Sequence, residues 1–302
     1  MSKQAKSLRR VIDDYAGQRL HVIDELTSSP QRTIAITSGK GGVGKSNLVI
    51  NMAIALASSG MRVLVVDADL GLANIDLLLG ITTPYTLEHV ATGEVSLEDI
   101  QVTGPGGIKI IPGGSGAQRL LRTSEEERAS LMRSLRELDD QADFIIIDTG
   151  AGLSPNVLTF LKFVHEIIVV TTPEPTSVAD AYATVKTIAY ENPGASIMIV
   201  VNMARSPKNA QDIAGNISVV AKKFLGIDLD FLGSVPRDPM VLKAVAMQQP
   251  FLLSYPSSNA SKAVIRLTEK LAGEKQEASG NMRWGLSELF SRMFYRVESD
   301  HI

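Results

Sequence analysis

The sequence predicts an α/β protein with a mostly parallel, twisted sheet covered by helices on both faces. From Thr33 onward, short β-branched runs alternate with stretches of helical periodicity, the pattern of parallel strands joined by crossover helices. Several runs are apolar at consecutive positions, as in 145–147 and 167–170, which is typical of strands buried on both faces. The expected strands are 33–37, 62–67, 108–111, 144–148, 166–171, 196–202 and 230–234.

Composition excludes several classes of protein. The 302-residue chain has a formal charge of −3, so binding to nucleic acid or anionic lipid would need a local patch. It has no cysteine, which excludes disulfides, thiolate zinc sites and cysteine-bound iron–sulfur clusters. No window reaches the roughly 18 apolar residues of a spanning helix. The polar, basic N-terminus lacks the apolar core of a secretory signal, so we expect a cytoplasmic protein.

The chain divides into four expected segments. Residues 1–30 carry a short amphipathic pattern that ends in a Thr-Ser-Ser-Pro break. Residues 31–273 form the α/β domain. Residues 274–282 form a linker, polar and small over 274–280, and 283–302 form a second amphipathic helix.

The first expected strand is followed by a phosphate-binding loop. Residues 39–46 read GKGGVGKS, the pattern G-x-x-x-x-G-K-S, between a strand and a helix. Glycines let backbone N–H groups surround a phosphate, and the helix N-terminus adds partial positive charge. Lys45 should reach the β- and γ-phosphates, and the Ser46 hydroxyl should hold Mg²⁺. The expected nucleotide-binding residues here are Gly39, Lys40, Gly41, Gly42, Val43, Gly44, Lys45, Ser46 and Asn47.

A second lysine, Lys40, gives the loop the form K-G-G-V-G-K-S, and here the sequence resembles the deviant Walker A ATPases of the MinD and ParA group. The resemblance implies a MinD-like P-loop fold, ATP or ADP with Mg²⁺ as cofactors, and an ATP-dependent homodimer in which Lys40 contacts the partner's nucleotide. A cation supplied in trans stabilises charge on the transferring phosphoryl group, so hydrolysis would depend on dimerisation.

Three carboxylates follow apolar strands. Asp67 and Asp69 end the second strand, and Asp148 ends the run 144–148, so all three should emerge at the carboxyl edge of the sheet, where ligands bind in open α/β folds. The resemblance implies that Asp67 and Asp148 belong to the Mg²⁺ shell and that Asp69 positions the attacking water. Together with Lys40 and Lys45, Asp69 completes the expected catalytic set.

Residues 71–76 and 150–152 resemble the two switch segments of the same group. Their glycines would permit the backbone movement that γ-phosphate contact and release drive. Asn202, Pro236 and Asp238 match the positions at which the group holds adenine, although an asparagine at a strand end is equally often a turn residue.

The tail pattern predicts an amphipathic helix. Its apolar positions recur at helical spacing behind Trp284, with three arginines nearby, which suits reversible burial in a membrane interface. The alternative is a helix that docks on its own domain. The residues expected to contact lipid are Trp284, Leu286, Leu289, Phe290, Met293 and Phe294.

The N-terminus reads K-Q-A-K-S-L-R and resembles the activator motif D-Q-A-x-x-L-R of the FlhG family (YlxH, FleN), which regulates flagellar number. The resemblance implies that this segment stimulates the SRP-type GTPase FlhF through Gln4, Leu8 and Arg9, and that flagellar switch (C-ring) proteins are further partners. Lys3 departs from the motif's Asp, which leaves that contact open.

Three rival functions remain at this stage. A partition ATPase of the ParA type would bind DNA, but the basic pairs at 9–10 and 222–223 are small. A cell-division MinD normally starts almost directly at its first strand. A P-loop ligase or synthetase would need a substrate pocket and would form a product besides hydrolysing ATP, and Lys40 and the two ends of the chain argue against it.

Overall fold

The structure is a computed structural model. It describes residues 31–69, 74–81, 84–86, 89–90, 92–112, 124–273 and 285–299. The predicted segments 1–30 and 274–282, and therefore Gln4, Leu8 and Arg9, lie outside the described residues.

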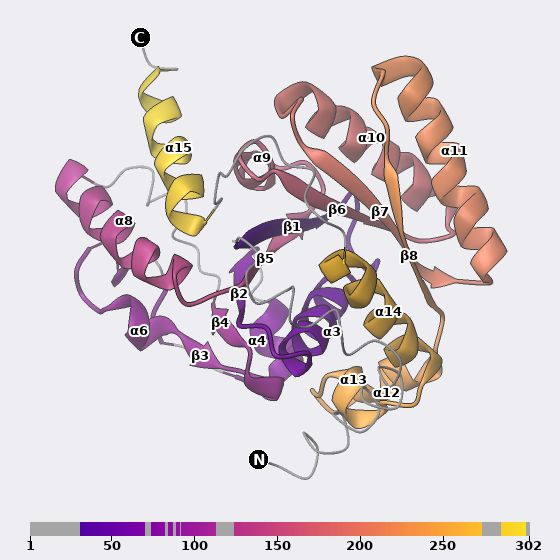
Figure 1. The fold of residues 1–302 in the computed structure, drawn as a ribbon, viewed down its shortest axis with the longest axis horizontal. Coiled ribbons are helices and arrows are strands. Elements are labelled where there is room, and N and C mark those ends of the chain that lie inside the picture. The colour runs from indigo at the N-terminus through magenta and orange to yellow at the C-terminus, as the bar shows by residue number, and fades with distance from the viewer. Residues whose placement is uncertain are drawn as a thin grey trace.

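One eight-stranded sheet organises the described residues, in the order β3-β4-β2-β5-β1-β6-β7-β8 (Figure 1). Only the β3–β4 pair is antiparallel among these strands. The seven predicted strands are all present, and the sequence reading missed β3, whose two residues are too few to show alternation. The strands are β1 Arg32–Ser38, β2 Val63–Ala68, β3 Val102–Thr103, β4 Lys109–Ile111, β5 Phe144–Ala151, β6 Glu166–Thr171, β7 Ser196–Ala204 and β8 Asp230–Pro236.

Many of the helices begin at recognisable caps. Proline occupies a first-turn position in α9, α10, α11 and α12, where its missing N–H costs nothing, and a Ser or Asp side chain caps three of these four. The helices are α3 Lys45–Ser58, α4 Asn74–Leu79, α6 Leu97–Ile100, η1 Pro105–Gly107, α8 Glu125–Asp139, α9 Pro155–Leu161, α10 Pro175–Glu191, α11 Pro207–Leu225, α12 Pro239–Ala246, α13 Phe251–Ser254, α14 Asn259–Gly273 and α15 Leu286–Ser299.

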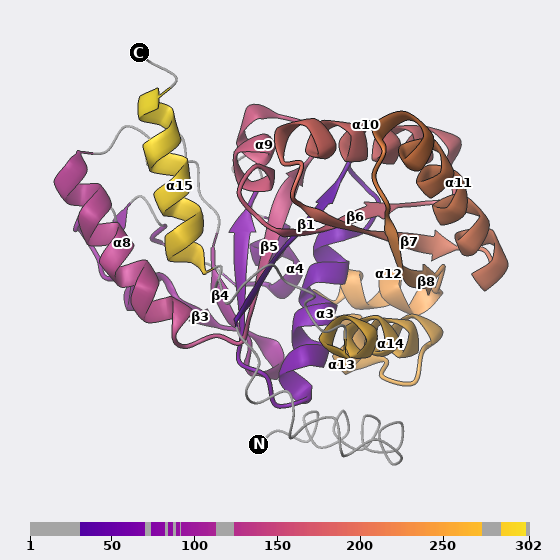
Figure 2. The same cartoon turned by 45° about the horizontal axis from the view of Figure 1, so that its top comes forward.

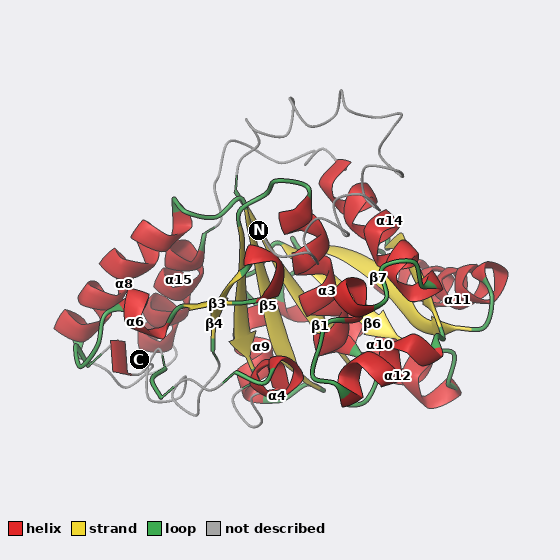
Figure 3. Cartoon of the chain, turned by 90° about the horizontal axis from the view of Figure 1, so that it is seen from below, coloured by secondary structure: helices red, strands yellow, loops and turns green. Residues whose placement is uncertain are grey.

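The sheet is covered on both faces (Figures 2 and 3). Because successive strand side chains point to opposite faces, Ile145 and Ile147 join one buried cluster while Phe144 and Ile146 join the other. The first cluster lies beneath α8, α9, α10, α11 and α15, and the second beneath α3, α12, α13 and α14. This is the predicted fold class. No helix among the described residues is long and apolar enough to cross a bilayer.

The parallel register aligns the strand ends that carry the predicted site. Asp67 on β2 lies directly opposite Asp148 on β5, and Ser38 at the end of β1 lies opposite Ala151. The phosphate-binding loop and the predicted carboxylates therefore share one edge of the sheet, as the sequence analysis expected.

Candidate nucleotide-binding site

The phosphate-binding loop connects β1 to α3. Gly44 caps α3 in the left-handed region (φ 84°), and a Cβ there would lie 2.5 Å from Asn202 Nδ2, so both its conformation and its surroundings require glycine. Asn202 donates from that nitrogen to the carbonyl of Val43 over 2.7 Å. The carboxyl end of β7 therefore contacts and supports the phosphate-binding loop.

Lys45 is the first residue of α3 and lies inside the site. It is 7 % exposed, and its ammonium forms an ion pair with Asp148, which is fully buried. If Lys45 reaches the phosphates as predicted, it must exchange part of that contact for phosphate oxygens. Such an exchange is electrostatically neutral for the lysine, because one anionic partner replaces another.

Asp67 and Asp148 form a buried carboxylate pair. Asp67 accepts hydrogen bonds from the backbone N–H groups of Asp69 (2.9 Å) and Ile75 (3.4 Å). Burial and the neighbouring Asp148 raise the pKa of Asp67 to about 7. Burial also raises the pKa of Asp148, while Lys45 opposes the rise. A pair of this kind is costly without a cation beside it.

The donor set fits Mg²⁺. Asp148 Oδ2 is buried without a hydrogen-bond partner, an orphaned acceptor at the place where the metal is expected. Mg²⁺ usually keeps several waters and is bound through one or two carboxylates plus phosphate oxygens. Ser46, Asp67 and Asp148 would hold the ion, directly or through water. The bound ion would neutralise charge on the phosphates.

Asp69 lies beside the second predicted switch. A Cβ added to Gly150 would lie 3.4 Å from Asp69 Oδ1, so the carboxylate is close to the backbone of this segment. The N–H of Gly152 donates to the carbonyl of Ser38 over 2.8 Å, which ties the segment to the start of the phosphate-binding loop. Half of the first predicted switch, residues 71–73 of 71–76, lies outside the described residues.

Two of the predicted base-binding residues, Asn202 and Asp238, form hydrogen bonds within the chain in this conformation. Asp238 accepts from the N–H of Met240 (2.9 Å) and from the N–H of Ala260 (3.1 Å), so its carboxylate caps α12 and ties α14 to it. Asn202 also accepts from the N–H of Met203, a non-glycine residue at φ 54°. Pro236 ends β8. Adenine contacts by these residues stay a prediction.

The side chain of Lys40 contacts the start of α10. Its ammonium contacts Glu174 Oε2 at 2.5 Å and Thr176 Oγ1 at 3.1 Å. The sequence analysis missed Glu174, and no local pattern marks it, because it lies 134 residues from Lys40.

The tail helix docks on the domain in this structure (Figure 2). Leu286, Leu289 and Phe290 are buried in the first cluster, α15 contacts α8, and the ring of Phe290 meets that of Phe160 on α9 edge to face at 6.4 Å. The structure therefore has the alternative arrangement, and these three residues are not available to lipid in this conformation. Trp284 and the side chains of Met293 and Phe294 lie outside the described residues.

Asp139, the last residue of α8, caps the docked tail. Its carboxylate accepts from the N–H of Leu286 (2.6 Å), the N–H of Ser287 (3.0 Å) and the Ser287 hydroxyl (2.5 Å). A Cβ added to Gly285 would lie 2.2 Å from the same carboxylate, so this approach requires glycine. The side chain of Gln31 donates to the carbonyl of Asp139 over 2.8 Å.

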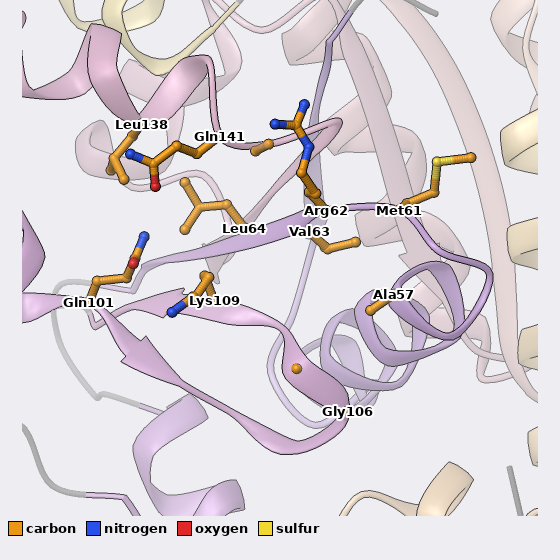
Figure 4. Close-up of a pocket in the computed structure, with 12 residues that line it drawn as sticks. Ala57, Met61, Arg62, Val63, Leu64, Gln101, Gly106, Lys109, Leu138 and Gln141 are labelled. Atoms are coloured by element: carbon orange, nitrogen blue, oxygen red, sulfur yellow. The ribbon is translucent and has the colours of Figure 1, made fainter. Parts of the chain in front are cut away.

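A cavity of about 320 Å³ lies at the other edge of the sheet (Figure 4). It is bordered by the starts of β2 and β4, with Arg62, Lys109 and Gln141 among its polar groups. Arg62 is already paired with Asp143, and Lys109 donates to Thr103. The cavity is thus separate from the phosphate-binding loop and brings together no catalytic set.

Comparison with known proteins matches this geometry to a family. Residues 29–272 match the ParA family, described as NUBPL iron-transfer P-loop NTPases. The antiactivator FleN of Pseudomonas aeruginosa is 38% identical over 242 residues, which cover 80% of this chain and 86% of FleN. The flagellum site-determining protein YlxH of Helicobacter pylori is 32% identical over 262 residues, or 86% of this chain and 88% of YlxH.

Solved structures of this family have the same fold. The septum site-determining protein MinD of Pyrococcus horikoshii, in complex with Mg-ADP, is 30% identical and has a TM-score of 0.63, covering 82% of this chain and 100% of that chain.

The chain belongs to the ParA family of P-loop NTPases. The predicted MinD-like fold, the resemblance to the MinD/ParA group and to its FleN and YlxH members, the ATPase activity and the cofactors ATP or ADP with Mg²⁺ are confirmed. The iron-transfer description does not extend to cysteine ligation here, since the sequence contains no cysteine.

Proposed function

We propose that this ATPase regulates the number and placement of flagella by a nucleotide-controlled change of partner and location. ATP with Mg²⁺ holds a homodimer through Lys40, the dimer releases the tail helices to the inner face of the cell membrane, and hydrolysis through Asp69 reverses both. The N-terminal segment stimulates the GTPase FlhF, and flagellar switch (C-ring) proteins are the further partners.

The flagellar part of the proposal is supported by the relatives. Both FleN, an antiactivator, and YlxH, a flagellum site-determining protein, align with more than three quarters of this chain and of their own lengths. The alternative, a septum-site function like that of MinD, draws on the similarity to MinD. A partition function gains little from the surface, because Lys222 is paired with Asp228 and Lys223 lies over the ring of Phe224.

The proposed nucleotide control of membrane binding depends on one observation: the apolar face of α15 is buried against the domain. Leu286, Leu289 and Phe290 are at most 2 % exposed, and burying such side chains contributes about 1.5–3 kcal/mol each. Lipid would have to compete with this packing, so a lone docked tail binds poorly. Two tails released together on one dimer bind far more tightly than one, through effective concentration.

Asp139→Ala separates docking from lipid affinity, because it removes the cap of α15 and leaves every apolar residue of the helix intact. Loss of a helix cap costs about 0.5–2 kcal/mol, or roughly 2- to 30-fold in the docking equilibrium. We expect the variant to co-sediment with anionic liposomes even with ADP, whereas the intact chain does so with an ATP analogue.

Asp140→Ala is the matched control, since Asp140 is the adjacent residue and is exposed. A chain ending at residue 273 should bind under neither condition. Liposome binding that ignores the truncation and the nucleotide would contradict the membrane part of the proposal.

The partner role is tested separately. A peptide of residues 1–20 should raise GTP hydrolysis by FlhF, and the same peptide with Gln4→Ala should not. If the unchanged peptide has no effect, the FlhF assignment is wrong, whatever the outcome with liposomes.

A further inference from the structure

Gln248, just after α12, has a backbone conformation that favours glycine. Its φ is 51°, and Met203 is the other non-glycine residue with a positive φ in the part of the chain that the structure describes. The N–H of Gln249 donates to the carbonyl of Ala244 over 3.0 Å, so the chain turns back over the end of α12. Glycine is the usual residue at such a turn, because it has no Cβ. Any contribution of Gln248 beyond that of glycine must therefore come from its side chain.

That side chain reaches the end of α4. Its Nε2 donates to the carbonyl of Leu77 over 3.0 Å, although the two residues lie 171 positions apart. The last carbonyls of a helix have no partner within the helix, so a side chain from another element can satisfy one of them. A Cβ at Gly80 would lie 3.5 Å from Gln248 Oε1, so the amide also lies beside the turn that ends α4.

The opposite end of α4 contacts the predicted metal site. The N–H of Ile75, the second residue of α4, donates to Asp67 Oδ2 over 3.4 Å, and the side chain of Ile75 is fully buried. With six residues, α4 is too short to be stable by itself, so its position depends on contacts with the rest of the fold. Gln248 and Asp67 supply such contacts at its two ends.

We propose that Gln248 is a positioning residue for Mg²⁺-dependent ATP hydrolysis. By holding the carboxyl end of α4, it keeps the N–H of Ile75 on Asp67, and groups that orient a metal-binding carboxylate strengthen metal binding. The inference rests on the predicted place of Asp67 in the Mg²⁺ shell, and not on the flagellar or membrane parts of the proposed function. Because Gln248 is exposed, it can be changed without opening the core.

Two substitutions remove the donor in different ways. Gln248→Gly deletes the side chain and suits the positive φ, so the midpoint of thermal unfolding should not fall. Gln248→Glu keeps the length of the side chain, but an ionised carboxylate cannot donate to the Leu77 carbonyl. In full-length protein without nucleotide or metal, both variants should accelerate amide exchange in α4 by about 2- to 10-fold, the effect of one hydrogen bond. Exchange in α3 should not change.

Gln249→Glu is the matched control, since it adds the same charge at the next residue. Gln249 Oε1 accepts from the hydroxyl of Ser254 over 3.0 Å, a bond that a carboxylate can also accept. Exchange in α4 should therefore be the same in this variant as in the unaltered chain. Equal acceleration in Gln249→Glu and Gln248→Glu would assign the effect to charge and overturn the proposal.

The metal requirement separates a positioning role from a merely structural one. The Mg²⁺ concentration for half-maximal ATP hydrolysis should rise by about 2- to 10-fold in both Gln248 variants and stay constant in Gln249→Glu. At saturating Mg²⁺, kcat should change less, because the predicted catalytic residues are intact. Unchanged exchange in α4, or faster exchange with an unchanged Mg²⁺ requirement, would overturn the inference.

Asp67→Asn tests the step on which the inference rests. If this variant has the Mg²⁺ requirement of the unaltered chain, Asp67 is not in the metal shell and the inference fails with it. Failure of the liposome or FlhF experiments would count against the proposed function and would leave these measurements unaffected.

Discussion

Two carboxylates near opposite ends of β5 have opposite roles: Asp148 is buried and Asp139 is half-buried. Asp148 at the carboxyl end has one oxygen on Lys45 and the other without a partner. Asp139, a few residues before the strand begins, has both oxygens occupied by the first residues of α15. Both have raised pKa values, chiefly because of burial. The two carboxylates differ in their hydrogen bonds, and Asp148 also faces the ammonium of Lys45.

This contrast separates a ligand site from a structural joint. A buried acceptor left without a partner costs stability unless something outside the chain supplies the missing interaction, and at Asp148 we expect Mg²⁺ to supply it. A carboxylate whose oxygens already accept hydrogen bonds from the protein cannot bind a ligand as well, but it links the segment that donates those bonds to the rest of the fold. Asp139 couples the tail to the end of α8. We expect loss of the tail to leave the nucleotide site intact.

The largest expected effect is at the joint. Phe290→Ala leaves a cavity against Phe160, and buried Phe-to-Ala substitutions cost about 3–5 kcal/mol. Because α15 can open alone, we expect amide exchange in residues 286–292 to accelerate by about 100-fold or more, with the remaining domain unchanged. Phe224→Ala, at a 65 % exposed side chain, is the control. Equal acceleration over the whole domain would show that the tail is not a separable unit.

At the other end of β5, Asp148→Asn should lower Mg²⁺-dependent ATP hydrolysis by about 10- to 100-fold, the usual cost of disturbing a metal shell. The amide keeps the size of the side chain and removes the charge that faces Lys45 and the metal. Steady-state phosphate release measures the effect, and docking of α15, followed by amide exchange, should be unaffected. Unchanged hydrolysis would remove Asp148 from the site.

The pH dependence of the metal-free protein tests the carboxylate pair itself. Asp67 has a pKa of about 7 against an ordinary 3.8, so the folded state binds this proton more tightly than the unfolded state. Its contribution to stability is complete below pH 3.8 and is lost as the pH rises through 7. Mg²⁺ binding has the opposite sign, because the metal needs the deprotonated carboxylate.

Thermal unfolding with and without Mg²⁺ between pH 5 and pH 8, compared with Asp67→Asn, isolates this group. We expect the stabilisation by Mg²⁺ to grow with pH in the unaltered chain and to be flatter in the variant. A variant with the same pH dependence as the unaltered chain would assign the titration to another group.

The smallest effect should come from Asp143→Asn, one residue before β5. Its ion pair with Arg62 is solvent-exposed on the arginine side, so the free energy of unfolding should fall by less than about 1 kcal/mol. ATP hydrolysis should not change. Chemical denaturation measures the free energy of unfolding, and phosphate release measures hydrolysis. If Asp143→Asn lowered hydrolysis as much as Asp148→Asn, the two ends of β5 would not differ in their role in catalysis.

Much of the fold was predictable because its signals are local. The apolar run at 145–147 fixes a buried strand by its own composition, and the loop 39–46 fixes a phosphate site by its glycines and its place before a helix. Strand β3 escaped prediction because two residues show no periodicity. The contact of Glu174 with Lys40 could not be predicted, because the two residues lie 134 positions apart in the sequence.

The sequence by itself determined the class of fold, the phosphate-binding loop and the aspartates at the strand ends, since each depends on residues that are neighbours along the chain. The tertiary structure determined the contacts between residues that are far apart in the sequence. Asp139 meets Leu286 across 147 residues, and Asp238 meets Ala260 across 22, so no pattern could show that one holds the tail and the other joins two helices. The amphipathic pattern of the tail suits both a bilayer and a protein surface, because both bury an apolar face. Only the structure shows that, in this conformation, the tail packs against α8 and α9.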